Sequence, residues 1–252
     1  MSLDVLVAGA TGRFGAVAEL LLDRGHRVRV LTRDPASAAA SALEEHRARI
    51  VRGDYDDPRS LAAAARGVDV VFASGTAHRA GPQGELRHGV NLVQALAAAG
   101  APHLVYVSGA GAHRDTGVPV LESKRRVEER LRAADLPHTV LAPVYLMENA
   151  LNPWNLRALH HGKLALALPP RRRLQQVATA DVVAFAVLAL ERVQELAGER
   201  IELVGDELTG PQAAAALSQA SGRDIEYEQL EPSELARRDQ GVPSRRRRAV
   251  PG

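Results

Sequence analysis

Cysteine is absent from this chain of 252 residues, and aromatic residues make up only 3% of it. Without cysteine the chain has no disulfide, no thiolate metal site and no cysteine nucleophile. With so few aromatic side chains it offers little surface on which nucleic-acid bases could stack. No apolar run reaches the length of a membrane span, and no signal-like segment precedes the first apolar run, residues 3–8. We therefore expect a cytoplasmic protein that binds neither a membrane nor nucleic acid.

Lysine is nearly absent as well, because 30 of the 32 basic residues are arginine and the only lysines are Lys124 and Lys163. The formal net charge is +2, and residues 237–252 hold six arginines against one acid. The rest of the chain is therefore net negative. We predict that residues 237–252 form a basic, disordered tail rather than a nucleic-acid site. The nine histidines show no metal-ligand spacing, so we predict no metal site.

A glycine-rich segment follows the first apolar run. Its glycines have the spacing G-x-x-G-x-x-G, and a helix-like stretch begins after them at Ala16. Glycine at these positions lets the backbone turn tightly, approach a pyrophosphate and pack the helix against the strand. The helix N-terminus adds free N–H groups for the phosphates. We predict a dinucleotide site that uses Gly9, Thr11, Gly12, Arg13, Phe14 and Gly15.

The pattern of apolar and polar segments predicts the fold class. Strand-like runs at 28–32, 48–52, 68–72, 104–107 and 138–141 alternate with helix-like stretches, and residues 77–84 resemble a loop. Residues 68–72 are nearly continuous in apolar residues, which is typical of a parallel strand that is buried on both faces. We predict an α/β protein with a doubly wound parallel-sheet Rossmann fold over residues 1–142. Residues 143–236, with a strand at 200–204, are predicted to form a small C-terminal α/β substrate-binding subdomain interleaved with that sheet.

The carboxyl ends of the predicted strands supply further candidates, because open parallel sheets bind their ligands there. Asp54 follows the third strand and either bonds the adenine amino group or closes a turn. Ser108 follows the fifth strand and is expected to place its hydroxyl near the nicotinamide. The other predicted cofactor contacts at these ends are Tyr55, Ala73, Ser74, Gly75 and Pro143.

Arg33 closes the second predicted strand. An acid at this position favours NAD, whereas a guanidinium suits the 2′-phosphate of NADP; the alternative is a solvated surface arginine. Asp34 and Pro35 predict a helix start with Asp34 as the N-cap, and Asp57 with Pro58 repeats that signal.

Lys124 is the main candidate for chemistry. On a predicted helix over residues 120–134, Val120, Lys124, Val127 and Leu131 share one face, and the apolar three are expected to pack on the sheet. A lysine on an apolar face is costly without a partner. Its ammonium can donate to a ribose hydroxyl and stabilise a developing oxyanion, so we interpret Lys124 as a cofactor-binding and catalytic residue. The alternative is a lysine that reaches solvent from the helix edge.

Several of these segments resemble a known family. The glycine segment at 9–15, Thr32 to Pro35, Gly53-Asp54, Val105 to Ser108 and Glu122 to Lys124 are similar to atypical short-chain dehydrogenase/reductases. Met147-Glu148-Asn149, shortly after Pro143, and the segment 177–182 resemble the NmrA-like branch, and the resemblance covers residues 3–230. That branch includes NADPH-dependent reductases of quinones and dyes together with non-catalytic NAD(P) sensors. Val120 stands where classical members carry the tyrosine of Tyr-x-x-x-Lys.

These observations predict an NADPH-dependent oxidoreductase, with NADPH preferred over NADH, that transfers hydride to a planar, apolar acceptor. A quinone or a conjugated or aromatic ketone can accept hydride without a tyrosine acid, because its oxyanion is delocalised. The alternative is a non-catalytic NADP(H)-binding redox sensor that regulates a protein partner. We expect a monomer or homodimer with a small-molecule substrate. The candidate substrate residues are Tyr145, Met147, Asn149, Leu151 and Trp154.

Overall fold

The computed structural model describes residues 2–231, and the chain divides into two compact units. Among the described residues, the first unit contains residues 2–144 and 177–204, and the second contains residues 145–176 and 205–231. The predicted basic tail, residues 237–252, lies outside the described residues. The chain thus leaves the first unit after residue 144 and returns to it for one further helix–strand segment.

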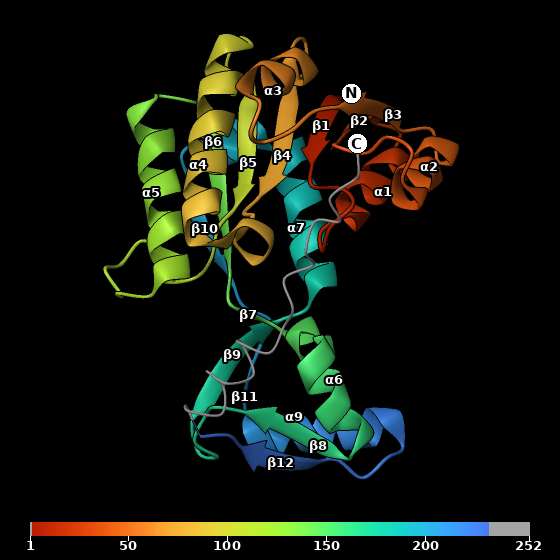
Figure 1. Ribbon diagram of the computed structural model, residues 1–252, viewed down its shortest axis with the longest axis vertical. Coiled ribbons are helices and arrows are strands. Elements are labelled where there is room, and N and C mark those ends of the chain that lie inside the picture. The colour runs from red at the N-terminus through yellow and green to blue at the C-terminus, as the bar shows by residue number, and fades with distance from the viewer. Residues whose placement is uncertain (1, 232–252) are drawn as a thin grey trace, which may run out of the picture. The chain divides into compact units, whose positions relative to one another are not determined.

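A seven-stranded sheet with the order β10-β6-β5-β4-β1-β2-β3 forms the centre of the first unit (Figure 1). All its neighbouring strands pair in parallel. The strands are β1 (Asp4–Ala8), β2 (Arg27–Thr32), β3 (Arg49–Arg52), β4 (Val70–Ser74), β5 (His103–Val107), β6 (His138–Pro143) and β10 (Arg200–Leu203). This order is that of a doubly wound Rossmann-like sheet, so the predicted fold class is confirmed.

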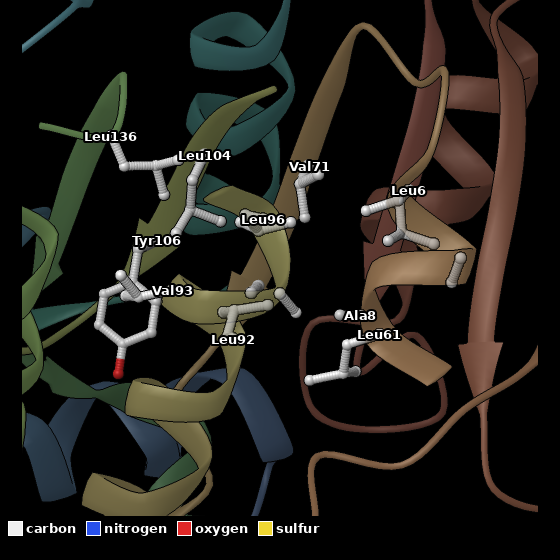
Figure 2. Packing of buried hydrophobic residues seen from close by; sticks show 14 of the residues in the cluster. Leu6, Ala8, Leu61, Val71, Leu92, Val93, Leu96, Leu104, Tyr106 and Leu136 are labelled. Carbon is white, nitrogen blue, oxygen red and sulfur yellow. The ribbon is translucent and has the colours of Figure 1, made fainter. Parts of the chain in front are cut away.

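Helices cover both faces of this sheet. They are α1 (Ala16–Asp23), α2 (Ala38–Glu45), α3 (Pro58–Ala65), α4 (Ala77–Ala98), α5 (Pro119–Ala133), α7 (Thr179–Glu191) and the short α8 (Val193–Leu196). Side chains of α3, α4 and α5 pack with Leu6, Val71 and Leu104 in one buried cluster, part of which Figure 2 shows. The intervening strand residues, such as Val5 and Val7, are fully buried on the opposite face, where α1 packs against α7. Alternate strand residues therefore fill two cores.

The second unit is smaller. Its elements are β7 (Tyr145–Leu146), the 3-10 helix η1 (Met147–Leu151), α6 (Pro153–His160), β8 (Lys163–Leu166), β9 (Arg173–Val177), β11 (Asp206–Thr209), α9 (Gly210–Ser221) and β12 (Glu226–Gln229). They form a three-stranded sheet, β11-β9-β7, and a two-stranded sheet, β12-β8. Leu159, Leu164, Ala214 and Ile225 make its core.

Two local predictions are wrong. Residues 77–84 are not a loop, because α4 begins at Ala77 and is only interrupted at Gly81, whose φ of 69° lies in the left-handed region, before Pro82. Asp34 does not cap α2: the helix begins at Ala38, and the Ser37 hydroxyl accepts the Ala40 N–H. The Asp34 carboxylate accepts the Ala36 N–H instead and closes a turn before the helix.

The second predicted cap is confirmed. Asp57 is the N-cap of α3, its carboxylate accepts the N–H groups of Arg59 and Ser60, and Pro58 follows at the first helical position. The strand predicted at 200–204 is β10, which pairs with β6 and so extends the central sheet of the first unit.

Candidate functional site

The glycine turn lies at the carboxyl end of β1, in the middle of the sheet. Gly9 has a φ of 101°, which favours glycine, and its carbonyl accepts the Gly12 N–H at 2.9 Å. The Gly15 N–H donates to the Gly12 carbonyl at 3.0 Å, and a Cβ on Gly15 would overlap the Ala10 carbonyl oxygen. This close approach of backbone segments explains why the motif needs glycine.

The side chains of this turn divide between core and solvent. Phe14 is buried and anchors the turn, whereas Thr11, Gly12 and Arg13 are exposed. A phosphate at the turn would therefore meet exposed backbone that carries no bulky side chain at Gly9 or Gly12. These features fit the pyrophosphate of a dinucleotide.

Lys124 and Glu85 form an ion pair beside the loop that follows β4. The Lys124 Nζ lies 2.7 Å from Glu85 Oε1, and the Ser123 hydroxyl donates to Glu85 Oε2 at 2.5 Å. The Glu85 side chain is 1% exposed and that of Lys124 is 14% exposed. A Cβ on Gly75 would overlap both the carboxylate oxygen and the ammonium nitrogen. Lys124 therefore has the partner that its apolar surroundings require.

Gly109 lies beside the stem of the same lysine. A Cβ there would stand 3.3 Å from Lys124 Cδ, and the Gly75 N–H donates to the Val107 carbonyl at 3.2 Å. The lysine thus runs along the loops that follow β4 and β5, at the carboxyl edge where parallel sheets bind ligands.

Ser108 belongs to a second buried network. Its hydroxyl donates to Glu128 Oε1 at 2.5 Å, and Arg200 Nε donates to Glu128 Oε2 at 3.0 Å. Another Arg200 nitrogen donates to the Gly109 carbonyl at 2.9 Å. This network joins the loop after β5 to α5 and β10. The Ser108 hydroxyl proton is therefore donated to the Glu128 carboxylate.

The loop after β3 carries Asp54 and Tyr55. The Asp54 carboxylate accepts the Asp56 N–H at 3.1 Å, which is the turn that the sequence left as one of two interpretations. The Tyr55 ring stacks on His88, with ring centroids 5.4 Å apart. Its buried hydroxyl has no hydrogen-bond partner among the described residues, and burial raises the pKa of Tyr55 far above its usual value.

The remaining candidates lie at different places. Arg33 is exposed directly after β2, Ala73 is buried and Ser74 half-buried at the end of β4, and Pro143 is buried at the end of β6. The predicted substrate residues belong to the second unit, where Tyr145, Met147 and Asn149 are half-buried and Leu151 is 61% exposed. Trp154 is part of α6, and its side chain lies outside the described residues.

One part of the helix-face prediction for α5 is wrong. Val127 and Leu131 are buried, but Val120 is 40% exposed, because it stands in the first turn of α5, beyond the core that Val127 and Leu131 enter. The same helix also carries a charged cluster, in which the guanidinium groups of Arg125 and Arg126 hold the pKa of Glu122 at about 2.

The sequence analysis missed Glu85. Glu85, Gly89, Leu92 and Leu96 share one face of α4, and Leu92 and Leu96 are buried. A lone acid on that face is as unusual as the lysine on α5 and could have been found by the same reasoning.

Other parts of the described chain provide weaker candidates for a functional site. A hollow of about 710 Å³ lies at the amino ends of β1, β2 and β3, opposite the candidate site, and Asp4, Arg27 and Arg49 are among its lining residues. Among residues 2–231 no cluster of histidine and acidic side chains could hold a metal ion. None of the described helices is both long and apolar enough to cross a membrane.

Comparison with known proteins yields one family and several relatives. The model of the NmrA-like family matches residues 1–246. An NAD(P)H azoreductase from Xenophilus azovorans is 29% identical over 243 residues, which are 95% of this chain and 82% of the relative.

Two solved structures share the fold. The triphenylmethane reductase of Citrobacter sp., complexed with NADP(H), has a TM-score of 0.82 at 21% identity over 96% of this chain and 85% of its own. The NADPH-dependent quinone oxidoreductase of Escherichia coli, complexed with NADPH, has a TM-score of 0.81 at 24% identity over 95% and 83%.

Proposed function

Because this chain belongs to the NmrA-like family, we propose that it is an NAD(P)H-dependent oxidoreductase that prefers NADPH and reduces a planar, apolar acceptor. A quinone or a conjugated or aromatic ketone fits that description. The azoreductase, dye reductase and quinone oxidoreductase that resemble the chain support this class of acceptor.

The observation that carries the proposal is the position of Lys124. Its ammonium lies beside Gly75 and its stem beside Gly109, at the carboxyl edge of the sheet, and the side chain is 14% exposed. NADPH, when bound at this edge, would supply a hydride. Lys124 donates a hydrogen bond to the ribose or to the oxygen that becomes negative as the acceptor is reduced, and water supplies the final proton. A quinone spreads that negative charge over its ring, so a single donor suffices.

The glycine turn and Arg33 are proposed to hold the cofactor. The turn from Gly9 to Gly15 receives the pyrophosphate through backbone N–H groups, and Asp54 and Tyr55 border the adenine end. The exposed Arg33 guanidinium receives the 2′-phosphate that distinguishes NADPH from NADH. Pro143, at the end of β6, is proposed to border the nicotinamide. Tyr145, Met147, Asn149 and Trp154 of the second unit are proposed to contact the acceptor.

Steady-state oxidation of NADPH against a panel of quinones, enones and azo dyes tests the proposal. Wild type should turn over at least one class of acceptor, and Lys124→Ala should lower kcat about 100-fold, as the loss of one oxyanion donor does in other enzymes. Lys163→Ala is the matched control, because Lys163 is the only other lysine and lies 49% exposed in the second unit. Its turnover should equal that of wild type.

The outcome also distinguishes the alternative function. Tight NADPH binding without turnover of any acceptor would contradict the enzyme and favour a redox sensor that acts through a protein partner. Turnover that Lys124→Ala leaves unchanged would retain the enzyme but remove the role of Lys124.

A further inference from the structure

Glu85 is a buried carboxylate with a cation beside it. Its side chain is 1% exposed, and each carboxylate oxygen has its own donor: Oε1 accepts from Lys124 and Oε2 from Ser123. The two donors are consecutive residues of α5, whereas Glu85 belongs to α4. The carboxylate therefore restrains the lysine and the backbone turn that carries it.

Two glycines lie against the Lys124 side chain, Gly75 at the ammonium and Gly109 at the stem. A Cβ on Gly75 would overlap both members of the ion pair, and one on Gly109 would press on the lysine stem. The ammonium consequently has little freedom to turn away from Glu85. The Lys124 side chain is 14% exposed, and this exposed part is the surface that a ligand at the carboxyl edge of the sheet can contact.

Stability alone does not explain this pair. Removing two charges from water is expensive, and apolar side chains often replace a buried ion pair without loss of stability. The helices α4 and α5 already have such an apolar contact, where Val127 packs against Gly89. The chain nevertheless places one of its two lysines here.

We propose that Glu85 is a positioning residue that, together with Ser123, holds the Lys124 ammonium in the direction in which it meets cofactor and acceptor. Glu85 touches neither of them and acts only through Lys124. This inference rests on the proposed function for its effect on turnover, but not for its effect on the lysine itself.

A double-mutant cycle on turnover tests the first effect. Glu85→Gln keeps the shape and removes the charge, and it should lower kcat about 10- to 100-fold, as misplacement of a reacting group does. In a Lys124→Ala background the same change should lower kcat no further, because Glu85 then has nothing to position. Equal losses in both backgrounds would mean that Glu85 acts by general stability, and would overturn the proposal.

Chemical labelling tests the second effect without any turnover. Because the chain has only two lysines, limited acetylation followed by peptide mass spectrometry measures Lys124 against Lys163 in the same molecule. In the protein without cofactor, Glu85→Gln should raise the labelling of Lys124 relative to Lys163 about tenfold, since the amine is released from its ion pair. An unchanged ratio would overturn the proposal.

Two further variants control for loosened packing. Glu128→Gln removes another buried carboxylate that accepts from a serine and a cation, and it should leave the labelling of Lys124 unchanged. Ser123→Ala removes the hydroxyl that donates to Glu85, and it should raise the labelling of Lys124 less than Glu85→Gln does. If Glu85→Gln does not fold, the labelling of Lys124 in Ser123→Ala tests the proposal in its place. Should wild type lack turnover, the proposed function fails, while the labelling ratio still decides whether Glu85 holds Lys124.

Discussion

At the scale of the residue, Arg33 is predicted to determine the preference for NADPH. It is exposed immediately after β2, with no carboxylate partner among the described residues. A charge-assisted bond to a phosphate contributes about 1.5–3 kcal/mol, so Arg33→Ala should weaken NADPH binding roughly 10- to 100-fold and leave NADH binding unchanged. Fluorescence titration of both cofactors measures this, with Arg52→Ala, exposed at the end of β3, as the control. Equal affinity of wild type for the two cofactors would refute the assignment.

His103 makes stability depend on pH. Burial first, and the charge of His138 second, lower the pKa of His103 to about 4, whereas an unfolded histidine has a pKa near 6.5. Between these values the unfolded chain binds the proton and the folded chain does not, so stability falls as pH decreases from about 6.5 to 4, by at most about 1.4 kcal/mol per pH unit. Above pH 6.5 this contribution is fully present.

Urea denaturation between pH 4 and pH 7 checks this expectation. His103→Gln keeps a donor for Thr139, the present partner of the ring, and removes the titrating group. Its free energy of unfolding should therefore fall less steeply with decreasing pH than that of wild type. Identical slopes would show that His103 does not contribute.

At the scale of the element, the contact of α4 with α5 depends on Gly89. A Cβ at this position would overlap the isopropyl group of Val127, which is 1% exposed. Gly89→Ala should therefore destabilise the protein by about 1–3 kcal/mol, although alanine favours helix. Thermal unfolding measures the loss, and Gln94→Ala, exposed on the same helix, should show none.

A second substitution, at Val127 of α5, tests the same contact. Adding Val127→Ala removes the overlapping methyl groups, so the double variant should lose less stability than the two single changes together. Additive losses would mean that the two helices do not meet through these side chains.

At the scale of the whole molecule, the C-terminal residues are predicted to be dispensable. The central sheet and the buried clusters of the two units are formed by residues within 2–231, and residues 240–252 are polar and basic without periodicity. A chain that ends at Asp239 should remain soluble and unfold at the same temperature as the full chain. A truncated chain that accumulates only as aggregate would contradict this.

The sequence by itself determined the central sheet and the glycine turn. Strand-like runs of four to six residues alternate with helix-like stretches, and this alternation predicts a parallel sheet with crossover helices. The glycine spacing is equally local, because Gly9 has a positive φ and a Cβ on Gly15 would overlap the Ala10 carbonyl oxygen. Asp57 could be assigned as a cap for the same reason, because its partners are Arg59 and Ser60.

Only the tertiary structure decided which groups meet over long separations. Lys124 and Glu85 are 39 positions apart, and Glu128 and Arg200 are 72 apart, so no local spacing joins them. The strand at 200–204 was predicted, but its place beside β6 depends on a chain that leaves the first unit and returns. The secondary structure of a segment depends mainly on residues close to it in sequence, so the local pattern predicts it. The partner of a buried charge depends on which segments pack together in space, so only the tertiary structure shows it.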